Sequence, residues 1–212
     1  MGLRLSANQI DGTSSSAADG TALSNALVSV GPAGRGGTGS FVSADGLMIT
    51  NHHVALEAVR QASSVDSDFV ANGFVARTRE EEIGGSDYEA WITRSTEDVS
   101  SAVQEACGSE QDSAKRAALI QRAKAEIVKK KTSTFPKDST LSCRVIDMWP
   151  GRIYVLFVFE RLLDVRIVYV PPFALGCFGG DTDNYEWPRH TADFALFRAC
   201  VLRMTPLISM LS

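Results

Sequence analysis

Two histidines stand side by side where an apolar run ends, in the stretch LMITNHHV from Leu47 to Val54. The chain has 3 histidines, and the remaining one is His190. An imidazole is the commonest general base of a nucleophilic hydrolase, where it takes the proton of the attacking hydroxyl or thiol. The sequence therefore offers His52, His53 and His190 as candidate bases.

A base of this kind is held in one tautomer by a carboxylate that is shielded from water. The best-placed carboxylate is Asp193 in TADFALFR, because it directly precedes an apolar run that is typical of a strand. We expect Phe194 in this run to belong to the core. Chymotrypsin-like barrels present their base as strand-Thr-x-x-His and their acid as Asp-apolar-small-Leu. TNHH and DFAL match these two patterns and select His53 and Asp193.

Other assignments stay open at this point. His52 is an alternative base, because adjacent residues in a turn can exchange roles, and His53 is an alternative cap of a strand end. Asp181 and Asp183 together with His52 and His190 are a conceivable set of ligands for a hydrolytic metal site. Their spacing does not require a metal, and we expect neither a metal nor an organic cofactor.

The elements that must position these residues are mostly β-strands. Two β-forming runs, Thr38 to Ser43 and Leu47 to Thr50, are separated by Ala-Asp-Gly, which predicts a hairpin that delivers the histidines at its far end. A short helix is expected after them. Three runs rich in Val, Ile and Phe between residues 141 and 170 predict further strands.

We divide the chain by composition and periodicity. Residues 1–37 are rich in Gly, Ser and Ala and are expected to form a flexible arm with one short ordered piece at ALVSV. Residues 38–200 are expected to form a partial β-barrel with a helical insertion at about 95–131, which Gly108 divides into two helices. Residues 201–212 are expected to be an unstructured tail.

Composition excludes several classes of protein. The chain has 212 residues, a hydrophobic content of 44% and a net charge of −4, which together argue for a packed core and against nucleic-acid binding through a basic face. The longest apolar run, IYVLFVF, is far shorter than the roughly 20 residues of a membrane-spanning helix. The N-terminus lacks the apolar core of a signal peptide, although Met-Gly-x-x-x-Ser matches the N-myristoylation pattern at Gly2. The 4 cysteines form no CxxC pair, and the sequence favours a cytoplasmic location.

Several stretches resemble the dipeptidyl-peptidase 7 family, namely GTGSFVSADGLMITNHHV, NGFVARTREEEI, LLDVRIVYVPP and FGGDTDNYEWPRHTADFALFR. The resemblance implies a chymotrypsin-like double β-barrel with a helical domain and a serine exopeptidase that removes dipeptides from peptides with a free N-terminus. It implies that His53 is the base and that Asp193 orients it. It also implies that Asn184 binds the substrate α-amino group, next to Tyr185, where the family has Trp.

The sequence departs from the family at further places. Gly37 and Val54 stand where the resemblance implies two bridged cysteines, and the joint absence fits a reducing compartment. The nucleophile of the family lies downstream in a Gly-x-Ser-Gly-like turn that this sequence lacks, and Ser40 and Ser86 are weak lookalikes. The chain therefore resembles an N-terminal portion of such an enzyme. A non-catalytic relative that depends on a partner is the alternative, and a homodimer is compatible with the sequence.

Overall fold

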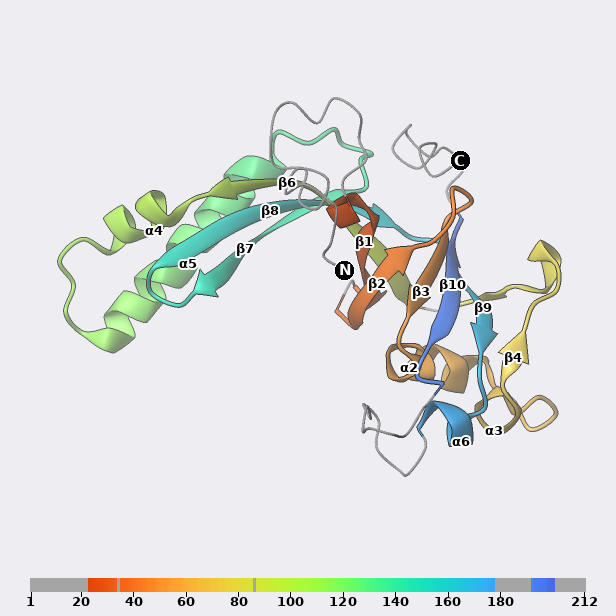
Figure 1. Ribbon diagram of the computed structural model, residues 1–212. Coiled ribbons are helices and arrows are strands. Elements are labelled where there is room, and N and C mark those ends of the chain that lie inside the picture. Colours follow the sequence, from red (N-terminus) through yellow and green to blue (C-terminus); the bar gives the residue numbers. More distant parts are fainter. Residues whose placement is uncertain (1–22, 34, 86, 178–191, 201–212) are drawn as a thin grey trace, which may run out of the picture. The chain divides into compact units, whose positions relative to one another are not determined.

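The computed structural model describes residues 23–33, 35–85, 87–177 and 192–200 (Figure 1). These residues fall into two compact units. The first unit takes its residues from 1–92 and 162–212, and the second spans 93–161. The two candidate residues with the strongest sequence signal, His53 and Asp193, both belong to the first unit.

The first unit is an antiparallel sheet built around a single core. Its strands are β1 (Leu27–Pro32), β2 (Gly37–Phe41), β3 (Leu47–Thr50), β4 (Phe74–Val75), β5 (Ile83–Gly84), the beginning of β6 (Tyr88–Asp98), β9 (Val165–Val170) and β10 (Ala195–Ala199). The strand order is β4-β9-β10-β3-β2-β1-β6, and β5 also pairs with β9. The prediction of a mostly β fold that forms part of a chymotrypsin-like barrel is confirmed.

The hairpin of β2 and β3 forms where Ala-Asp-Gly predicted it. Gly46 has a φ of +74°, a conformation that a side chain would disfavour. Phe41 pairs with Met48, and both side chains face the core. The hairpin thereby fixes which face of β3 is buried, and with it the direction in which the chain leaves the strand toward the histidines.

Part of the expected flexible arm is ordered. Residues 27–32 form β1, which lies between β2 and β6, and a short 3-10 helix, η1 (Leu23–Ala26), precedes it. Val28 and Val30 are buried in the core and supply the free energy that orders the segment. The short ordered piece expected at ALVSV within residues 1–37 is therefore present as β1.

Four further helical segments belong to the described part of this unit. They are α2 (His52–Ala62), α3 (Phe69–Asn72), α6 (Phe173–Gly176) and the 3-10 helix η2 (Arg79–Glu81). Ala55, Ala58 and Val59 of α2 are buried in the same cluster as Met48 and Phe197. This burial fixes the rotation of α2 about its axis, so the residues of its first turn hold fixed positions beside β3 and β10.

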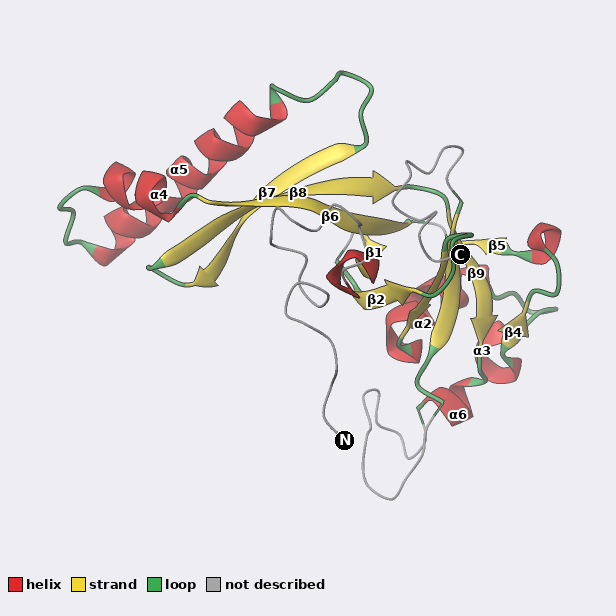
Figure 2. Ribbon diagram, turned by 45° about the horizontal axis from the view of Figure 1, so that its top comes forward, coloured by secondary structure: helices red, strands yellow, loops and turns green. Residues whose placement is uncertain are grey.

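The second unit combines helices with a hairpin. Helices α4 (Ser100–Cys107) and α5 (Ser113–Thr132) pack on a layer formed by the end of β6 with β7 (Leu141–Trp149) and β8 (Ile153–Leu162) (Figure 2). Val103, Ala123 and Tyr154 are buried between the two layers. Lys124 of α5 also forms an ion pair of 2.5 Å with Asp147 of β7. The second unit therefore combines the helices expected in the insertion with the strands expected after it.

The helical segment begins later than residue 95. Residues 95–98 continue β6, and α4 begins at Ser100, whose backbone N–H donates to Asp98 Oδ1 at 2.8 Å. The expected start at about residue 95 was wrong. Ser95-Thr96-Glu97-Asp98 is typical of a helix start, but the pairing of β6 with neighbouring strands overrides this local signal. Gly108 does end the first helix, with a φ of +51°.

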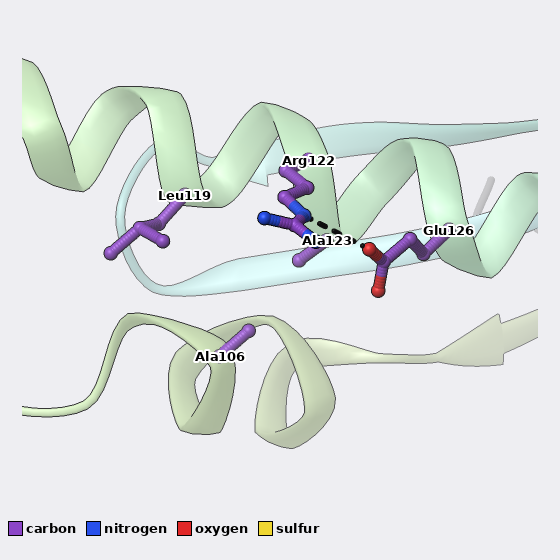
Figure 3. Close-up of a pocket in the computed structure, with 5 residues that line it drawn as sticks. All are labelled: Ala106, Leu119, Arg122, Ala123 and Glu126. Carbon is purple, nitrogen blue, oxygen red and sulfur yellow. Dashed lines mark hydrogen bonds and ion pairs between the residues drawn. The ribbon is translucent and has the colours of Figure 1, made fainter.

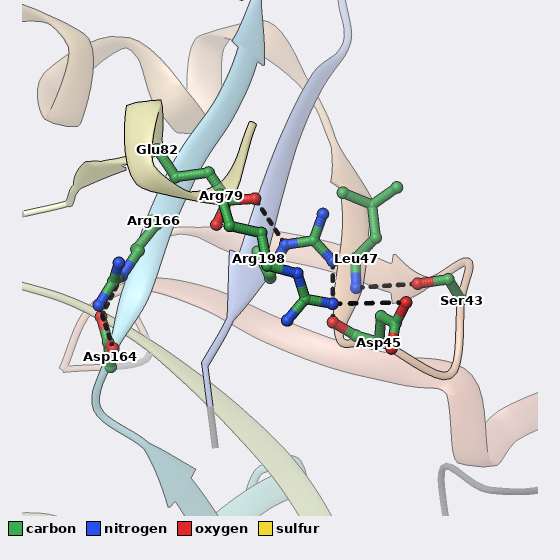
Figure 4. Close-up of polar contacts among 8 residues, drawn as sticks. All are labelled: Ser43, Asp45, Leu47, Arg79, Glu82, Asp164, Arg166 and Arg198. Atoms are coloured by element: carbon green, nitrogen blue, oxygen red, sulfur yellow. Dashed lines mark hydrogen bonds and ion pairs between the residues drawn. The ribbon is translucent and has the colours of Figure 1, made fainter. Parts of the chain in front are cut away.

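A polar network joins the C-terminal end of β10, at Arg198, to neighbouring segments (Figure 4). Arg198 Nε donates to Glu82 Oε1 at 2.6 Å, and the two side chains are 13% and 3% exposed. Arg198 Nη1 also donates to the backbone oxygen of Asp45 at 2.9 Å, and Asp45 pairs with Arg79 at 3.4 Å. Asp193 precedes the other end of the same strand, so this network helps to hold the strand that positions it.

Candidate active site

Both neighbouring histidines lie in the first turn of α2. The sequence suggested that they end a strand, but β3 ends at Thr50 and Asn51 has the extended conformation of an N-cap residue, with φ −73° and ψ 151°. His52 and His53 are therefore the first two residues of the helix. Consecutive helical residues point about 100° apart, which sends the two imidazoles into different surroundings.

His53 and Asp193 lie within hydrogen-bonding distance although they are far apart in the sequence. His53 Nδ1 lies 3.1 Å from Asp193 Oδ2. The Asp193 side chain is 11% exposed, whereas that of His53 is 33% exposed. The carboxylate is thus shielded while the imidazole remains accessible from outside, as a proton-transfer residue requires.

Pairing between two strands brings these residues together. Ala195 of β10 lies opposite Thr50 of β3, so the residues just before β10 meet those just after β3. The Asp193 carboxylate then reaches the N-terminus of α2, where Oδ1 accepts the backbone N–H of His53 at 3.2 Å. Asp193 therefore caps the helix from another segment of the chain, and the positive end of the helix dipole stabilises its charge.

His52 points into the interior. It is 1% exposed, and its Nδ1 lies 3.7 Å from Cys177 Sγ. A Cβ on Gly176 would lie 2.4 Å from the His52 ring, so only glycine lets α6 approach this closely. Burial lowers the pKa of His52, and the charge of Asp193 opposes this effect only in part. The geometry therefore favours His53 as the base and His52 as a neutral packing residue.

Val54 anchors the first turn of α2 on its other side. Tyr88 Oη donates to the backbone oxygen of Val54 at 2.6 Å in the interior. A Cβ on Gly37 would lie 2.4 Å from Val54 Cγ2, so the valine side chain packs directly on the backbone of β2. The positions of Gly37 and Val54, which the resemblance had linked, are neighbours in space.

The surface beside Asp193 is apolar. Phe194 is 38% exposed and stacks on Tyr169 at 5.3 Å between ring centroids, so the expectation that it belongs to the core was wrong. Ile49, 37% exposed, pairs with Leu196, which in turn pairs with Tyr169. Strand alternation explains the exposure, because these residues face away from the core that Met48 and Phe197 enter.

Sequence reasoning missed one member of the cluster. Asn51 Nδ2 donates to Asp193 Oδ2 at 3.0 Å. The available signal was its residue type, since asparagine directly before a helix is typical of an N-cap and of a side chain with a local polar role.

Several predicted residues lie outside the described part of the chain. They are Gly2, Ser86, Asp181, Asp183, Asn184, Tyr185 and His190. Ser40 lies in β2, where its hydroxyl donates to the backbone oxygen of Phe41 at 3.3 Å. Among the described residues, no three histidine, cysteine or acidic side chains gather as metal ligands. None of the described helices has both the length and the apolar character needed to cross a membrane.

A pocket of about 260 Å³ lies in the second unit between α4 and α5 (Figure 3). Its lining residues are Ala106, Leu119, Arg122, Ala123 and Glu126. Arg122 and Glu126 form a solvent-exposed ion pair of 3.1 Å one helical turn apart. The five lining residues include no nucleophile or imidazole, so the pocket does not compete with the His53–Asp193 cluster as a candidate active site.

An accessible imidazole, held by a shielded carboxylate at the end of an antiparallel barrel, is the arrangement in which serine-type hydrolases hold their base. Comparison with known proteins agrees with this class. The model of the Peptidase S46 family matches residues 2–203. The chain therefore belongs to the peptidase S46 family.

The relatives are dipeptidyl-peptidases by name. An Asp/Glu-specific dipeptidyl-peptidase of Capnocytophaga gingivalis is 38% identical over 175 residues, which cover 82% of this chain and 24% of the relative. Dipeptidyl-peptidase 7 of Porphyromonas gingivalis is 37% identical over 180 residues, or 85% of this chain and 24% of the relative. The chain thus spans about a quarter of the length of the curated relatives it matches.

A solved structure matches at the level of the fold. The crystal structure of Porphyromonas endodontalis DPP11 in complex with the dipeptide Arg-Asp superposes with a TM-score of 0.75 and 31% sequence identity. The match covers 93% of this chain and 27% of that chain. The resemblance to dipeptidyl-peptidases that the sequence suggested is confirmed.

Proposed function

We propose that this chain supplies the base-bearing barrel of a serine-type dipeptidyl-peptidase, which releases dipeptides from peptides with a free N-terminus. The observation that carries the proposal is the distance of 3.1 Å between His53 Nδ1 and Asp193 Oδ2. Membership of the S46 family and the names of the relatives support it. The nucleophilic serine is assigned to the part of the enzyme that the matched quarter does not include.

In this proposal the reaction is an acyl transfer. Asp193 holds the proton on His53 Nδ1, so that Nε2 accepts the proton of the serine hydroxyl as the oxygen attacks the peptide carbonyl. The same imidazole then returns the proton to the departing amine, and water repeats the cycle on the acyl-enzyme. Backbone N–H groups stabilise the oxyanion.

The exopeptidase character requires a subsite for the free amine. We assign Asn184 and Tyr185 to this subsite by their place in the family pattern. A carbonyl oxygen such as that of an asparagine side chain accepts a hydrogen bond from an ammonium group, and an aromatic face attracts the same cation. Substitution of Asn184 by Ala is expected to raise KM for dipeptidyl substrates more than it lowers kcat.

The proposal is tested with a chromogenic dipeptidyl substrate and a serine-reactive probe. The longest product of the gene should turn the substrate over, and Asp193→Asn should lower kcat by about 10³- to 10⁴-fold. Asp164→Asn is the matched control, because Asp164 is a partly exposed carboxylate paired with Arg166. Full activity of Asp193→Asn would refute the assignment.

A second candidate is a non-catalytic chain that depends on a partner. The exposed Ile49 and Phe194, which lie on one face with Tyr169, favour it, because contiguous apolar surface marks interaction sites. This candidate predicts neither labelling by the serine-reactive probe nor turnover, in the 212-residue chain and in any longer product alike. Labelling with turnover would exclude it.

A further inference from the structure

The side chain of Asn51 forms hydrogen bonds with Asp193 and none with the backbone of its own helix. Nδ2 donates to Asp193 Oδ2 at 3.0 Å and lies 3.4 Å from the Asp193 backbone oxygen. Asn51 occupies the N-cap position of α2, yet its side chain makes no capping hydrogen bond. The Asp193 carboxylate takes over the capping role by accepting the backbone N–H of His53.

The Asp193 carboxylate is therefore held by three hydrogen-bond donors from the N-cap and the first turn of α2. The backbone N–H of His53 holds Oδ1, while the His53 ring and the Asn51 amide share Oδ2. A carboxylate with one anchored oxygen can still turn about its terminal torsion, which is broad and soft. Asn51 holds the second oxygen from another side and so restricts this rotation.

We propose that Asn51 is a positioning residue that orients the Asp193 carboxylate toward the His53 ring. The inference rests on the proposed function for its catalytic meaning. The hydrogen bonds to Asp193 can be tested without turnover, since the three donors come from residues 51 and 53 of the chain itself. The base and its orienting acid are thereby assembled before any other part of the enzyme contributes.

Hydrogen exchange of the His53 backbone amide measures how firmly the Asp193 carboxylate is held. The His53 amide lies at the N-terminus of α2, where N–H groups lack an acceptor one turn earlier in the helix, so its protection from hydrogen exchange depends on Asp193. The amides of Val54 and Ala55 donate to the backbone oxygen of Asn51 and serve as internal controls. Asp193→Ala is the positive control and should abolish protection at His53 alone.

The test uses two substitutions of Asn51, measured by NMR hydrogen exchange in the 212-residue chain. Asn51→Ala should lower the protection factor of the His53 amide about 5-fold, the factor that a hydrogen bond of ordinary net strength is worth. Protection at Val54 and Ala55 should stay within 2-fold, a bound of about 0.4 kcal/mol (RT ln 2). A His53 protection factor equal to that of the unsubstituted chain would overturn the proposal.

Asn51→Asp keeps the shape but exchanges the donor for a carboxylate. Near pH 7.5 the two carboxylates repel, so protection at His53 should fall below that of Asn51→Ala. Near pH 5 they can share a proton, which restores a donor toward Asp193 and should raise protection above that of Asn51→Ala. The ratio of the His53 protection factor in Asn51→Asp to that in the unsubstituted chain should therefore rise from pH 7.5 to pH 5. A space-filling role would leave this ratio unchanged, and an unchanged ratio would refute the inference even if Asn51→Ala unfolds the helix.

Other titrating groups are controlled by the comparison between variants. The groups that face Asp193 are His53 on α2 and, at longer range, His52 on α2 and Cys177 after α6. All of them are present in the unsubstituted chain and in both variants, so each variant is compared with the unsubstituted chain at the same pH. Failure of the dipeptidyl-peptidase assay would leave this readout unchanged.

Discussion

Gly37 and Val54 lie close enough to be joined by an engineered disulfide. A Cβ built on Gly37 would lie 3.5 Å from Val54 Cβ, at the short end of the range of about 3.5–4.5 Å seen in native disulfides. The double variant Gly37→Cys with Val54→Cys is therefore expected to form the bridge on mild oxidation. The bridge would join β2 to the first turn of α2, which carries His53.

The expected gain follows from the size of the loop. The bridge closes a loop of about 18 residues, and the resulting restriction of the unfolded chain is worth about 3 kcal/mol. In the reduced state, loss of the buried methyl groups of Val54 costs about 1 kcal/mol. The oxidised variant should thus be about 2 kcal/mol more stable than the unsubstituted chain.

Thiol titration shows whether the bridge forms. Urea unfolding with and without reductant measures the gain from the bridge and the cost of losing the Val54 methyl groups. The unsubstituted chain and the two single variants are the controls for the native thiols. Of these, Cys107, Cys143 and Cys177 are buried and Cys200 is partly exposed. A double variant that keeps both new thiols free under oxidation, or that is less stable when bridged than when reduced, would refute the geometry.

Three further predictions concern buried polar groups. Burial lowers the pKa of His52 from 6.5, so the unfolded chain binds the proton more readily; stability should fall as pH drops below about 6.5, by up to about 1.4 kcal/mol per pH unit, and less steeply in His52→Gln. Equal slopes in urea titrations would contradict this. Tyr88→Phe removes the hydrogen bond that Tyr88 Oη donates to the Val54 backbone oxygen and should cost about 1 kcal/mol of unfolding free energy. Val54→Ala keeps this hydrogen bond, because the acceptor is a backbone atom. Glu82→Ala leaves Arg198 shielded without its carboxylate and should cost about 3 kcal/mol, and Glu82→Leu with Arg198→Met should recover most of it. A cost below about 1 kcal/mol for Glu82→Ala would show that the pair is solvated.

Local sequence identified the candidate base and acid because both stand at strand junctions with specific neighbours. It could not show that they touch, since 140 residues separate them. That contact depends on the pairing of β3 with β10 and on the capping of α2 by Asp193. The sequence favoured His53 over His52, and the helix gives the physical reason, because it turns the His52 ring inward and leaves the His53 ring accessible.

The error in the helix boundary has the same origin. Residues 95–98 look helical in the sequence, yet they belong to a strand because β6 pairs with neighbouring strands. Phe194 looks like a core residue by type, but strand alternation places it on the outer face.

The sequence by itself determined the β-rich fold, the Asp-Gly hairpin and the types of residue able to do proton transfer, because these depend on short-range propensity and pattern. Only the tertiary structure decided that the His53 ring touches the Asp193 carboxylate and that Asn51 holds the same oxygen. Such relations arise from strand register and helix packing, which join segments far apart in the chain and leave no local trace in the sequence.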